Sequence, residues 1–165
     1  MMNFSRQTSR ALHEDHRANL QVLARAEQAF SRAQRGGNAV DPEFLKLIAA
    51  LAQTLEQDID RHFGFEEREL FPRMEQAGDG GIATLLADEH EAIRAVAEEL
   101  LPLARAAASS SLDAAGWDTL RQCVMELVER QVSHIQKEEM ALLPMLDDLL
   151  DEETDRQLAF DYAAS

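Results

Sequence analysis

The sequence is poor in cysteine, in aromatic residues and in basic charge. Its single cysteine, Cys123, cannot form a disulfide within the chain, and this scarcity is typical of proteins from a reducing compartment. There are 16 Lys and Arg against 31 Asp and Glu, which gives a formal net charge of −15 at pH 7. Because a surface that binds nucleic acid or anionic lipid needs clustered basic residues, we expect neither nucleic acid nor membrane as a partner.

The sequence also lacks hydrophobic runs of the kind that membranes require. No apolar stretch approaches the length of a membrane span, and residues 1–16 are too polar to contain the hydrophobic region of a secretory signal. These absences predict a cytoplasmic location.

Helix breakers are few and grouped, with seven glycines and four prolines in 165 residues. Alanine and leucine dominate the apolar residues while aromatics make up only 5%, a composition that favours helix over sheet. Between the breaks, apolar residues recur with the helical period in four segments. The predicted breaks are Gly36-Gly37, the N-cap Asp41 with Pro42, Gly78–Gly81, Ser109–Ser111 and the N-cap Asp113.

Four long helices with short connections predict an all-α fold, an antiparallel up-down-up-down four-helix bundle. A short acidic helix is expected to follow from about Asp151. The length suits one domain, so we expect a single domain over residues 1–165 with its bundle core at about residues 8–147. Pro72, Pro102 and Pro144 interrupt the apolar pattern, and the sequence does not settle their effect on the helices.

An internal repeat carries polar residues into the helical pattern. The segment from His62 to Met74 aligns without gaps with the segment from His134 to Leu146, and both read His-x-x-x-Glu-Glu-x-x-Leu-x-Pro. Upstream, residues 12–16 align with residues 86–90, and each of these segments ends in a histidine. Each half of the chain is therefore predicted to be a helical hairpin with one histidine on its first helix and a His-x-x-x-Glu pair on its second.

The spacing of the repeat predicts that these polar side chains meet inside the bundle. Residues four apart lie on one helix face, and His16 and His62 lie roughly 27 Å and 30 Å along the chain from the first connection, which places them at one level. Buried carboxylates are costly unless something compensates them, and a metal ion would do so. The candidate ligands are His16, His62, Glu66, His90, His134 and Glu138.

The types of these residues restrict the metal. Four imidazoles and two carboxylates without a thiolate exclude a cysteine zinc site and argue against calcium or magnesium, which prefer oxygen ligands. The set suits iron, with manganese and zinc as competitors. Ferritin-like di-iron bundles use Glu-x-x-His, and the residues three before the four histidines are not glutamates. They are His13, Ile59, Ala87 and Gln131.

The doubled motif resembles that of the hemerythrin-like, or HHE cation-binding, family, over roughly Leu12 to Leu146. The resemblance implies a non-haem di-iron centre in a four-helix bundle, with an oxo or hydroxo group between the metals. It also implies that His16 and His62 bind one iron and that His90 and His134 bind the other. Glu66 and Glu138 would bridge the two irons.

Two features depart from the oxygen-carrying and repair members of that family. Oxygen carriers place a fifth histidine on the third helix four residues from its partner, whereas this chain has Leu86 and Arg94 four residues from His90. The ligand set is closer to that of bacterial iron–sulfur-repair proteins and similar di-iron sensors. Those repair proteins carry a cysteine-containing N-terminal domain that this sequence does not show. The sequence leaves open whether His13 is a further metal ligand or lies behind the ligands.

Three functions remain after these observations. The favoured one is a binding protein that takes up O2 or NO for sensing, buffering or protection, in a pocket lined by residues such as Leu20, Ile59, Phe63 and Ile93. The alternative is iron handling, as an iron donor in iron–sulfur cluster repair or as an iron sensor. A peroxidase- or oxidase-like enzyme is less favoured, because fold analogy is its only support. The sequence identifies no protein partner.

Overall fold

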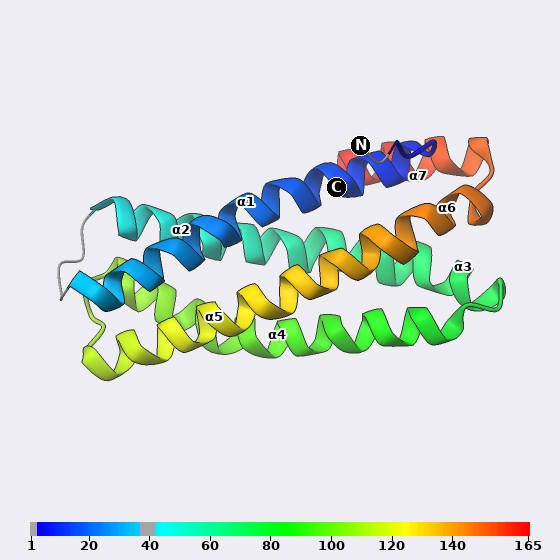
Figure 1. Cartoon of the computed structure of the whole chain (residues 1–165). Coiled ribbons are helices and arrows are strands. Elements are labelled where there is room, and N and C mark those ends of the chain that lie inside the picture. The colour runs from blue at the N-terminus through cyan, green and yellow to red at the C-terminus, as the bar shows by residue number, and fades with distance from the viewer. Residues whose placement is uncertain (1–2, 37–41) are drawn as a thin grey trace.

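The computed structural model describes residues 3–36 and 42–165, and every regular element in these ranges is helical. The prediction of an all-helical chain is therefore confirmed for the described residues. The long helices are arranged as rods that lie side by side along the long axis of the molecule, and the colours of Figure 1 show that successive rods run in opposite directions. The three π-helical segments within the rods are written with the letter η.

The first and third rods are single helices, α1 (Gln7–Gly36) and α4 (Gly80–Ala108). The second rod consists of α2 (Pro42–Gln57), η1 (Asp58–Phe63), η2 (Glu66–Leu70) and α3 (Phe71–Gln76). The fourth consists of α5 (Ala114–Lys137), η3 (Glu138–Leu142) and α6 (Leu143–Leu149). A last helix, α7 (Glu152–Ala164), packs beside the N-terminal part of α1 (Figure 1).

Side-chain caps fix two of the predicted helix starts. The carboxylate of Asp113 accepts a hydrogen bond from the Gly116 N–H at 2.8 Å, and that of Asp151 accepts one from the Thr154 N–H at 2.7 Å. These bonds satisfy backbone donors that the first turn of a helix leaves unpaired. The predicted cap at Asp41 lies outside the described residues.

Both copies of the repeat widen into a π-helical turn at the glutamate of the His-x-x-x-Glu pair. The N–H of Phe71 donates to the carbonyl of Glu66, and the N–H of Leu143 donates to the carbonyl of Glu138, five residues back in each case. A proline follows each turn directly and so lies in the first turn of α3 or α6, where its missing N–H is not needed. π-helical turns of this kind are frequent at functional sites.

The apolar side chains form two clusters at different levels of the bundle. One cluster contains Leu23, Ile93 and Val128, and the other contains Leu12 and Leu86. On α1, the predicted ligand His16 lies between residues of the two clusters, and on α4 the predicted ligand His90 does so. The polar layer is thus bordered by apolar packing on both sides along the bundle.

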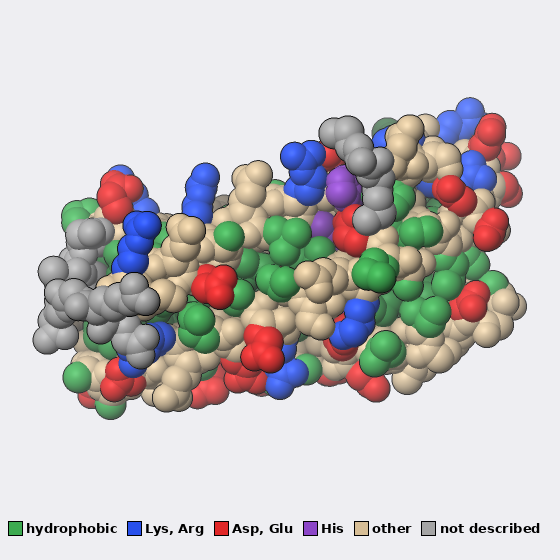
Figure 2. Space-filling model, viewed as in Figure 1, with side chains coloured by type: hydrophobic (Ala, Val, Ile, Leu, Met, Phe, Trp, Pro, Cys, Tyr) green, Lys and Arg blue, Asp and Glu red, His purple; other side chains and the backbone are tan. Residues whose placement is uncertain are grey.

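The outer surface is strongly charged. Figure 2 shows acidic and basic side chains scattered over the face in view, with hydrophobic side chains between them. This distribution agrees with the net charge of −15. No helix in residues 3–36 and 42–165 is both long and apolar enough to cross a membrane.

Candidate metal centre

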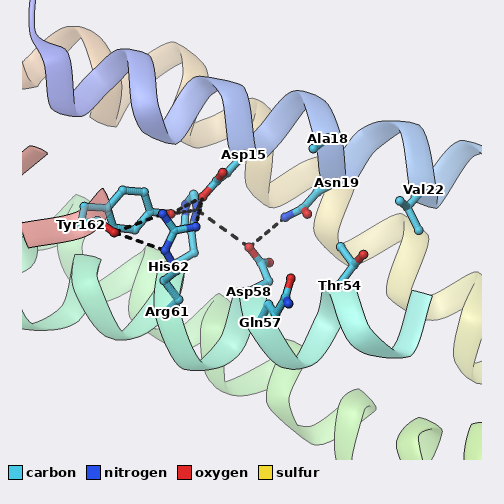
Figure 3. Close-up of a pocket in the computed structure, with 10 residues that line it drawn as sticks. All are labelled: Asp15, Ala18, Asn19, Val22, Thr54, Gln57, Asp58, Arg61, His62 and Tyr162. Carbon is cyan, nitrogen blue, oxygen red and sulfur yellow. Dashed lines mark hydrogen bonds and ion pairs between the residues drawn. The ribbon is translucent and has the colours of Figure 1, made fainter. Parts of the chain in front are cut away.

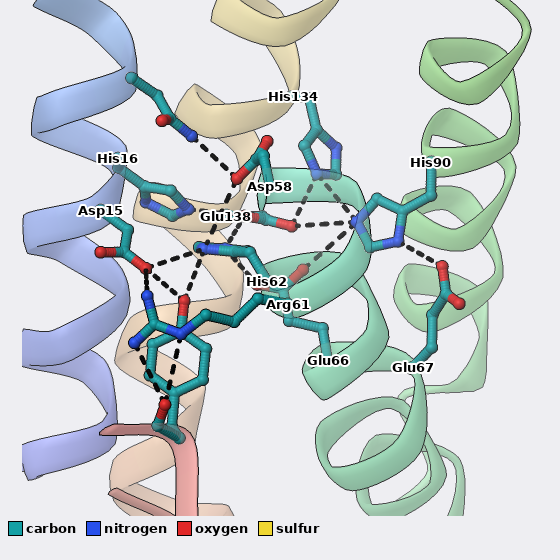
Figure 4. A network of polar contacts seen from close by, with 12 residues as sticks. Asp15, His16, Asp58, Arg61, His62, Glu66, Glu67, His90, His134 and Glu138 are labelled. Atoms are coloured by element: carbon teal, nitrogen blue, oxygen red, sulfur yellow. Dashed lines mark hydrogen bonds and ion pairs between the residues drawn. The ribbon is translucent and has the colours of Figure 1, made fainter. Parts of the chain in front are cut away.

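The structure brings all six predicted ligands into one buried layer (Figure 4). They come from all four rods, and none of them is more than 2% exposed. The six are His16 on α1, His62 on η1, Glu66 on η2, His90 on α4, His134 on α5 and Glu138 on η3.

Within this layer, the side chains form two groups of four that share both carboxylates. One group is His16, His62, Glu66 and Glu138. The other is Glu66, His90, His134 and Glu138. In each group, one potential ligand atom from each residue lies within 4.8 Å of the others, so that the four side chains could hold a metal ion between them.

Each carboxylate lies between two imidazoles that belong to different halves of the chain. One Glu66 oxygen is 3.0 Å from Nε2 of His62, and the other is 3.2 Å from Nε2 of His90. Likewise, one Glu138 oxygen is 2.8 Å from Nε2 of His16, and the other is 2.8 Å from Nε2 of His134. A carboxylate with its two oxygens directed to two separate sites is suited to join a pair of cations.

Several atoms of the layer have no hydrogen-bond partner. Among the described residues, Nε2 of His62, both oxygens of Glu66 and Oε1 of Glu138 are buried and make no hydrogen bond of acceptable geometry, although the imidazole and carboxylate atoms lie only 2.8–3.2 Å apart. Leaving a buried polar atom unpaired costs about 1–3 kcal/mol, and more for a charged group. Coordination of metal ions would satisfy these atoms, and imidazole with carboxylate is a donor set that divalent transition metals accept. The residues present therefore fit a metal site.

Three of the four histidines turn their outer nitrogen to a carboxylate. Nδ1 lies 2.6 Å from Glu139 in His16, 2.7 Å from Glu67 in His90 and 2.8 Å from Glu89 in His134. An imidazole that donates its Nδ1–H to a carboxylate presents the Nε2 lone pair to the interior and becomes a stronger donor to metal.

These outer carboxylates were missed in the sequence analysis, although the repeat contained the signal. Glu67 and Glu139 directly follow the two glutamates of the layer and occupy equivalent positions in the repeat. Asp15 and Glu89 are equivalent too, since each comes directly before a histidine of the layer. A repeated acidic residue next to a repeated ligand is a usable sign of such a contact.

The surroundings of His62 are different. Its Nδ1 lies 3.1 Å from the Tyr162 hydroxyl, whereas the nearest carboxylate oxygens, of Asp15 and Asp58, are at 3.7 Å and 3.8 Å. The Tyr162 hydroxyl in turn donates a hydrogen bond to Asp15. His62 is thus the one histidine of the layer whose outer nitrogen faces a neutral acceptor.

The two halves of the layer also differ in packing. The ring of Phe63 stacks on His90 with the ring centres 3.8 Å apart and the planes 6° from parallel. On the other side, Asp58 lies near His62 and accepts hydrogen bonds from Asn19 and Gln131, both at 2.8 Å. An aromatic ring therefore covers one half, and a buried polar group adjoins the other.

A cavity of about 160 Å³ opens beside His62, between α1 and the second rod (Figure 3). Polar side chains line much of it, including Asn19, Asp58, Arg61 and Tyr162. None of the residues expected to line an apolar pocket, Leu20, Ile59, Phe63 and Ile93, lines this cavity. Phe63 and Ile93 are buried in an apolar cluster, and Phe63 fills the space beside His90.

His13 and Arg94 lie behind the layer rather than in it. Nδ1 of His13 is 2.8 Å from Glu139, the carboxylate that also contacts His16. Arg94 occupies a position where oxygen carriers have their fifth histidine, and its guanidinium lies 2.9 Å from Glu67. Both residues therefore reach the layer only through an outer glutamate.

The charges of the metal-free layer compensate one another. Burial would lower the pKa of His16, but hydrogen bonds to Glu138 and Glu139 outweigh it and raise that pKa to about 9. Burial opposes the protonation of His90 in the same way, and its contacts with Glu138 and Glu66 raise its pKa to about 10. Although burial alone would raise the pKa of Glu138, the adjacent His134, His16 and His62 hold it well below its usual range. Protonated imidazoles thus replace metal as partners of the carboxylates.

We expect the metal-free protein to lose stability as the pH rises from about 6.5 towards 10. A histidine whose pKa is raised on folding contributes stability below its unfolded pKa of about 6.5, and that contribution disappears as the pH passes the folded value. For His16 and His90, the loss therefore spans the interval from 6.5 to about 9 and 10. Urea unfolding of chelator-treated protein at several pH values across this range measures the loss of unfolding free energy. A His90→Gln variant should show a smaller decline, and an unfolding free energy that stays constant or rises would contradict the expectation.

The sequence was compared with known families and proteins. A family model described as the hemerythrin HHE cation binding domain matches residues 7–146. The chain belongs to the hemerythrin family. A search of curated proteins found no match. The hemerythrin match includes all six residues of the layer and the outer glutamates, but it ends before α7, which carries Tyr162. The layer of histidines and glutamates is where this cation-binding domain could hold a metal ion.

Proposed function

We propose that the buried layer holds two iron ions and that the loaded centre takes up O2 or NO, for sensing, buffering or protection. The observation that carries the proposal is the sharing of Glu66 and Glu138 by both groups of four side chains. His16 and His62 would bind one ion, and His90 and His134 the other. Manganese and zinc are the competing metals, because the same donor types accept them.

The ligand count supports the uptake of a small molecule. Each group offers two imidazole nitrogens and two carboxylate oxygens, which are four protein donors for each ion. Non-haem iron commonly accepts about six ligands, so positions remain for a shared oxygen ligand and for an external one. When bound, the irons would supply this binding position and the electrons to reduce what binds there.

The surroundings of the layer support the same conclusion. Apolar clusters lie on both sides of the layer, and the cavity of about 160 Å³ beside His62 exceeds the roughly 10–15 Å³ that a cavity needs, on the same measure, to hold one water molecule. A diatomic molecule therefore has room beside His62. The outer carboxylates would hold the imidazoles in place as a ligand binds.

Anaerobically purified, iron-loaded protein should react with both gases. We expect NO to change the optical spectrum, and we expect O2 to oxidise the protein without a long-lived oxygenated form, since the fifth histidine of oxygen carriers is absent. Two ferrous ions, if bound by these residues, would supply the two electrons that, with two protons, reduce O2 to hydrogen peroxide. Metal analysis, stopped-flow absorption and a peroxide assay measure these results.

His13→Ala is the matched control, because His13 contacts Glu139 and not the layer, and it should react nearly as the unmodified protein does. Fully loaded ferrous protein that is inert to both gases would exclude gas uptake and leave iron handling as the better account. Transfer of iron to a metal-free cluster protein would then test that alternative. Many turnovers of peroxide formation with an added reductant would indicate an enzyme instead.

A further inference from the structure

Helix α7 lies outside the family match but is fixed to the start of α1. The carboxylate of Asp155 accepts hydrogen bonds from the backbone N–H groups of Gln7 at 2.8 Å and Thr8 at 2.9 Å. It thereby caps the first turn of α1, and the Thr8 hydroxyl donates back to the carbonyl of Asp155 at 3.3 Å. Asp155 is only 4% exposed, so this attachment is shielded from water. Two turns further along α7, Tyr162 consequently has a defined place.

Tyr162 is held on several sides. Tyr162 is only 1% exposed, and its ring packs against that of Phe65 with the ring centres 4.7 Å apart. The guanidinium of Arg61 lies 4.2 Å over the ring and donates a hydrogen bond to the Tyr162 carbonyl at 3.1 Å. The hydroxyl is directed to His62 and Asp15 at the edge of the cavity (Figure 3).

The hydroxyl stands where the other three histidines have a carboxylate. If Nε2 of His62 binds a metal, Nδ1 carries the proton, so it donates to the Tyr162 oxygen at 3.1 Å while the tyrosine donates to Asp15. The direct distance from Nδ1 to Asp15 is 3.7 Å, beyond an ordinary hydrogen bond. A phenol is a weaker acceptor than a carboxylate, and a weaker acceptor makes the imidazole a weaker donor to metal.

We propose that α7 is part of the metal centre, in which Tyr162 positions His62 and makes the His16/His62 half hold its metal differently from the His90/His134 half. This inference rests on the proposed metal centre. Metal in the His16/His62 half leaves first, because His62 is the one histidine of the layer whose Nδ1 has no carboxylate within hydrogen-bond distance; the nearest, Asp15 and Asp58, are 3.7 Å and 3.8 Å away. Removing the hydroxyl leaves the buried Nδ1–H without its acceptor and frees the ring of His62, so that this half releases its metal faster still.

The experiment compares unmodified protein with Tyr162→Phe, both loaded anaerobically with ferrous iron and mixed with a chelator. The unmodified protein should release iron in two phases, and Tyr162→Phe should accelerate the faster phase about tenfold, the lower end of the usual effect of such contacts on metal affinity. The slower phase should stay unchanged. Phe160→Ala, on the 69% exposed Phe160 of the same helix, is the control and should behave as unmodified protein.

A second readout separates positioning from general destabilisation. In zinc-loaded protein with ¹⁵N-labelled histidine, Tyr162→Phe should shift the Nδ1–H resonance of His62 and leave those of His16, His90 and His134 in place. Asp155→Asn, which loosens α7 at a distance, should shift the same resonance by less. Equal acceleration of both phases, unchanged or slower release, or an unmoved His62 resonance would overturn the inference. Unmodified protein that binds no metal would instead overturn the proposed centre.

Discussion

Glu66→Ala should empty both metal positions at once. The two oxygens of Glu66 lie 3.0 Å from His62 and 3.2 Å from His90, so that removing this carboxylate takes one donor from each group of four. We expect the metal content after dialysis to fall from about two ions per chain to well under one, because loss of a shared donor weakens both sites together. Glu138→Ala should have the same effect, since Glu138 lies between His16 and His134 in the same manner.

The neighbouring residue offers a matched control. Glu67→Ala makes the same substitution one residue along the chain, but Glu67 contacts only the outer nitrogen of His90 and Arg94. It should weaken one site, by roughly 10- to 100-fold in affinity, and leave the other close to normal. If Glu66→Ala lost one ion cleanly and kept the other at full affinity, Glu66 would not be a shared ligand.

Removal of the metal should lower the melting temperature by on the order of 10 °C. A ligand at a thousand times its dissociation constant stabilises the folded state by about 4 kcal/mol, and in a protein of this size each kcal/mol moves the melting temperature by roughly 2–4 °C. The physical source is coordination of the buried Glu66, Glu138 and His62 atoms, which approach one another but make no hydrogen bond of acceptable geometry. Calorimetry of chelator-treated and reloaded protein at pH 7 measures the difference.

The same measurement on Glu66→Ala is the control, because a protein that cannot hold the metal should melt alike with and without it. The metal-free protein should still fold, since protonated histidines replace the metal as partners of the carboxylates. Equal melting temperatures for metal-free and loaded protein would contradict a buried site. Acid should release the metal, because protons compete with it for the imidazole nitrogens.

The repeat explains why the arrangement of the layer could be predicted. In a helix, residues four apart share a face, so His62 with Glu66 and His134 with Glu138 had to point in one direction. Glycine pairs and capping aspartates marked where the rods end, and Gly36 and Asp113 are at those ends in the structure. Helix faces and helix ends depend on residues that are close together in the sequence, so both could be predicted from the sequence alone.

The features of the site that could not be predicted from the sequence depend largely on contacts between segments that are far apart in the chain. Tyr162 has no counterpart in the repeat, and its contact with His62 spans 100 residues. The cavity is set by which side chains fill space, and Phe63 turned out to cover His90 rather than to line an opening. The π-helical turns follow from backbone hydrogen bonds, for which Pro72 and Pro144 were ambiguous signs.

Two of the outer glutamates, Glu67 and Glu139, connect the two halves of the chain. Glu67, from the first hairpin, supports His90 of the second, while Glu139, from the second hairpin, supports His16 of the first. Each hairpin thus donates to its neighbour the same group that it receives in return. This reciprocity is the signature of a two-fold symmetric homodimer, in which one surface patch meets its own copy. The chain thus has the arrangement of two similar hairpins related by an approximate two-fold axis that passes between Glu66 and Glu138. Helix α7 with Tyr162 has no counterpart in the other half and makes the two sides of the layer unequal.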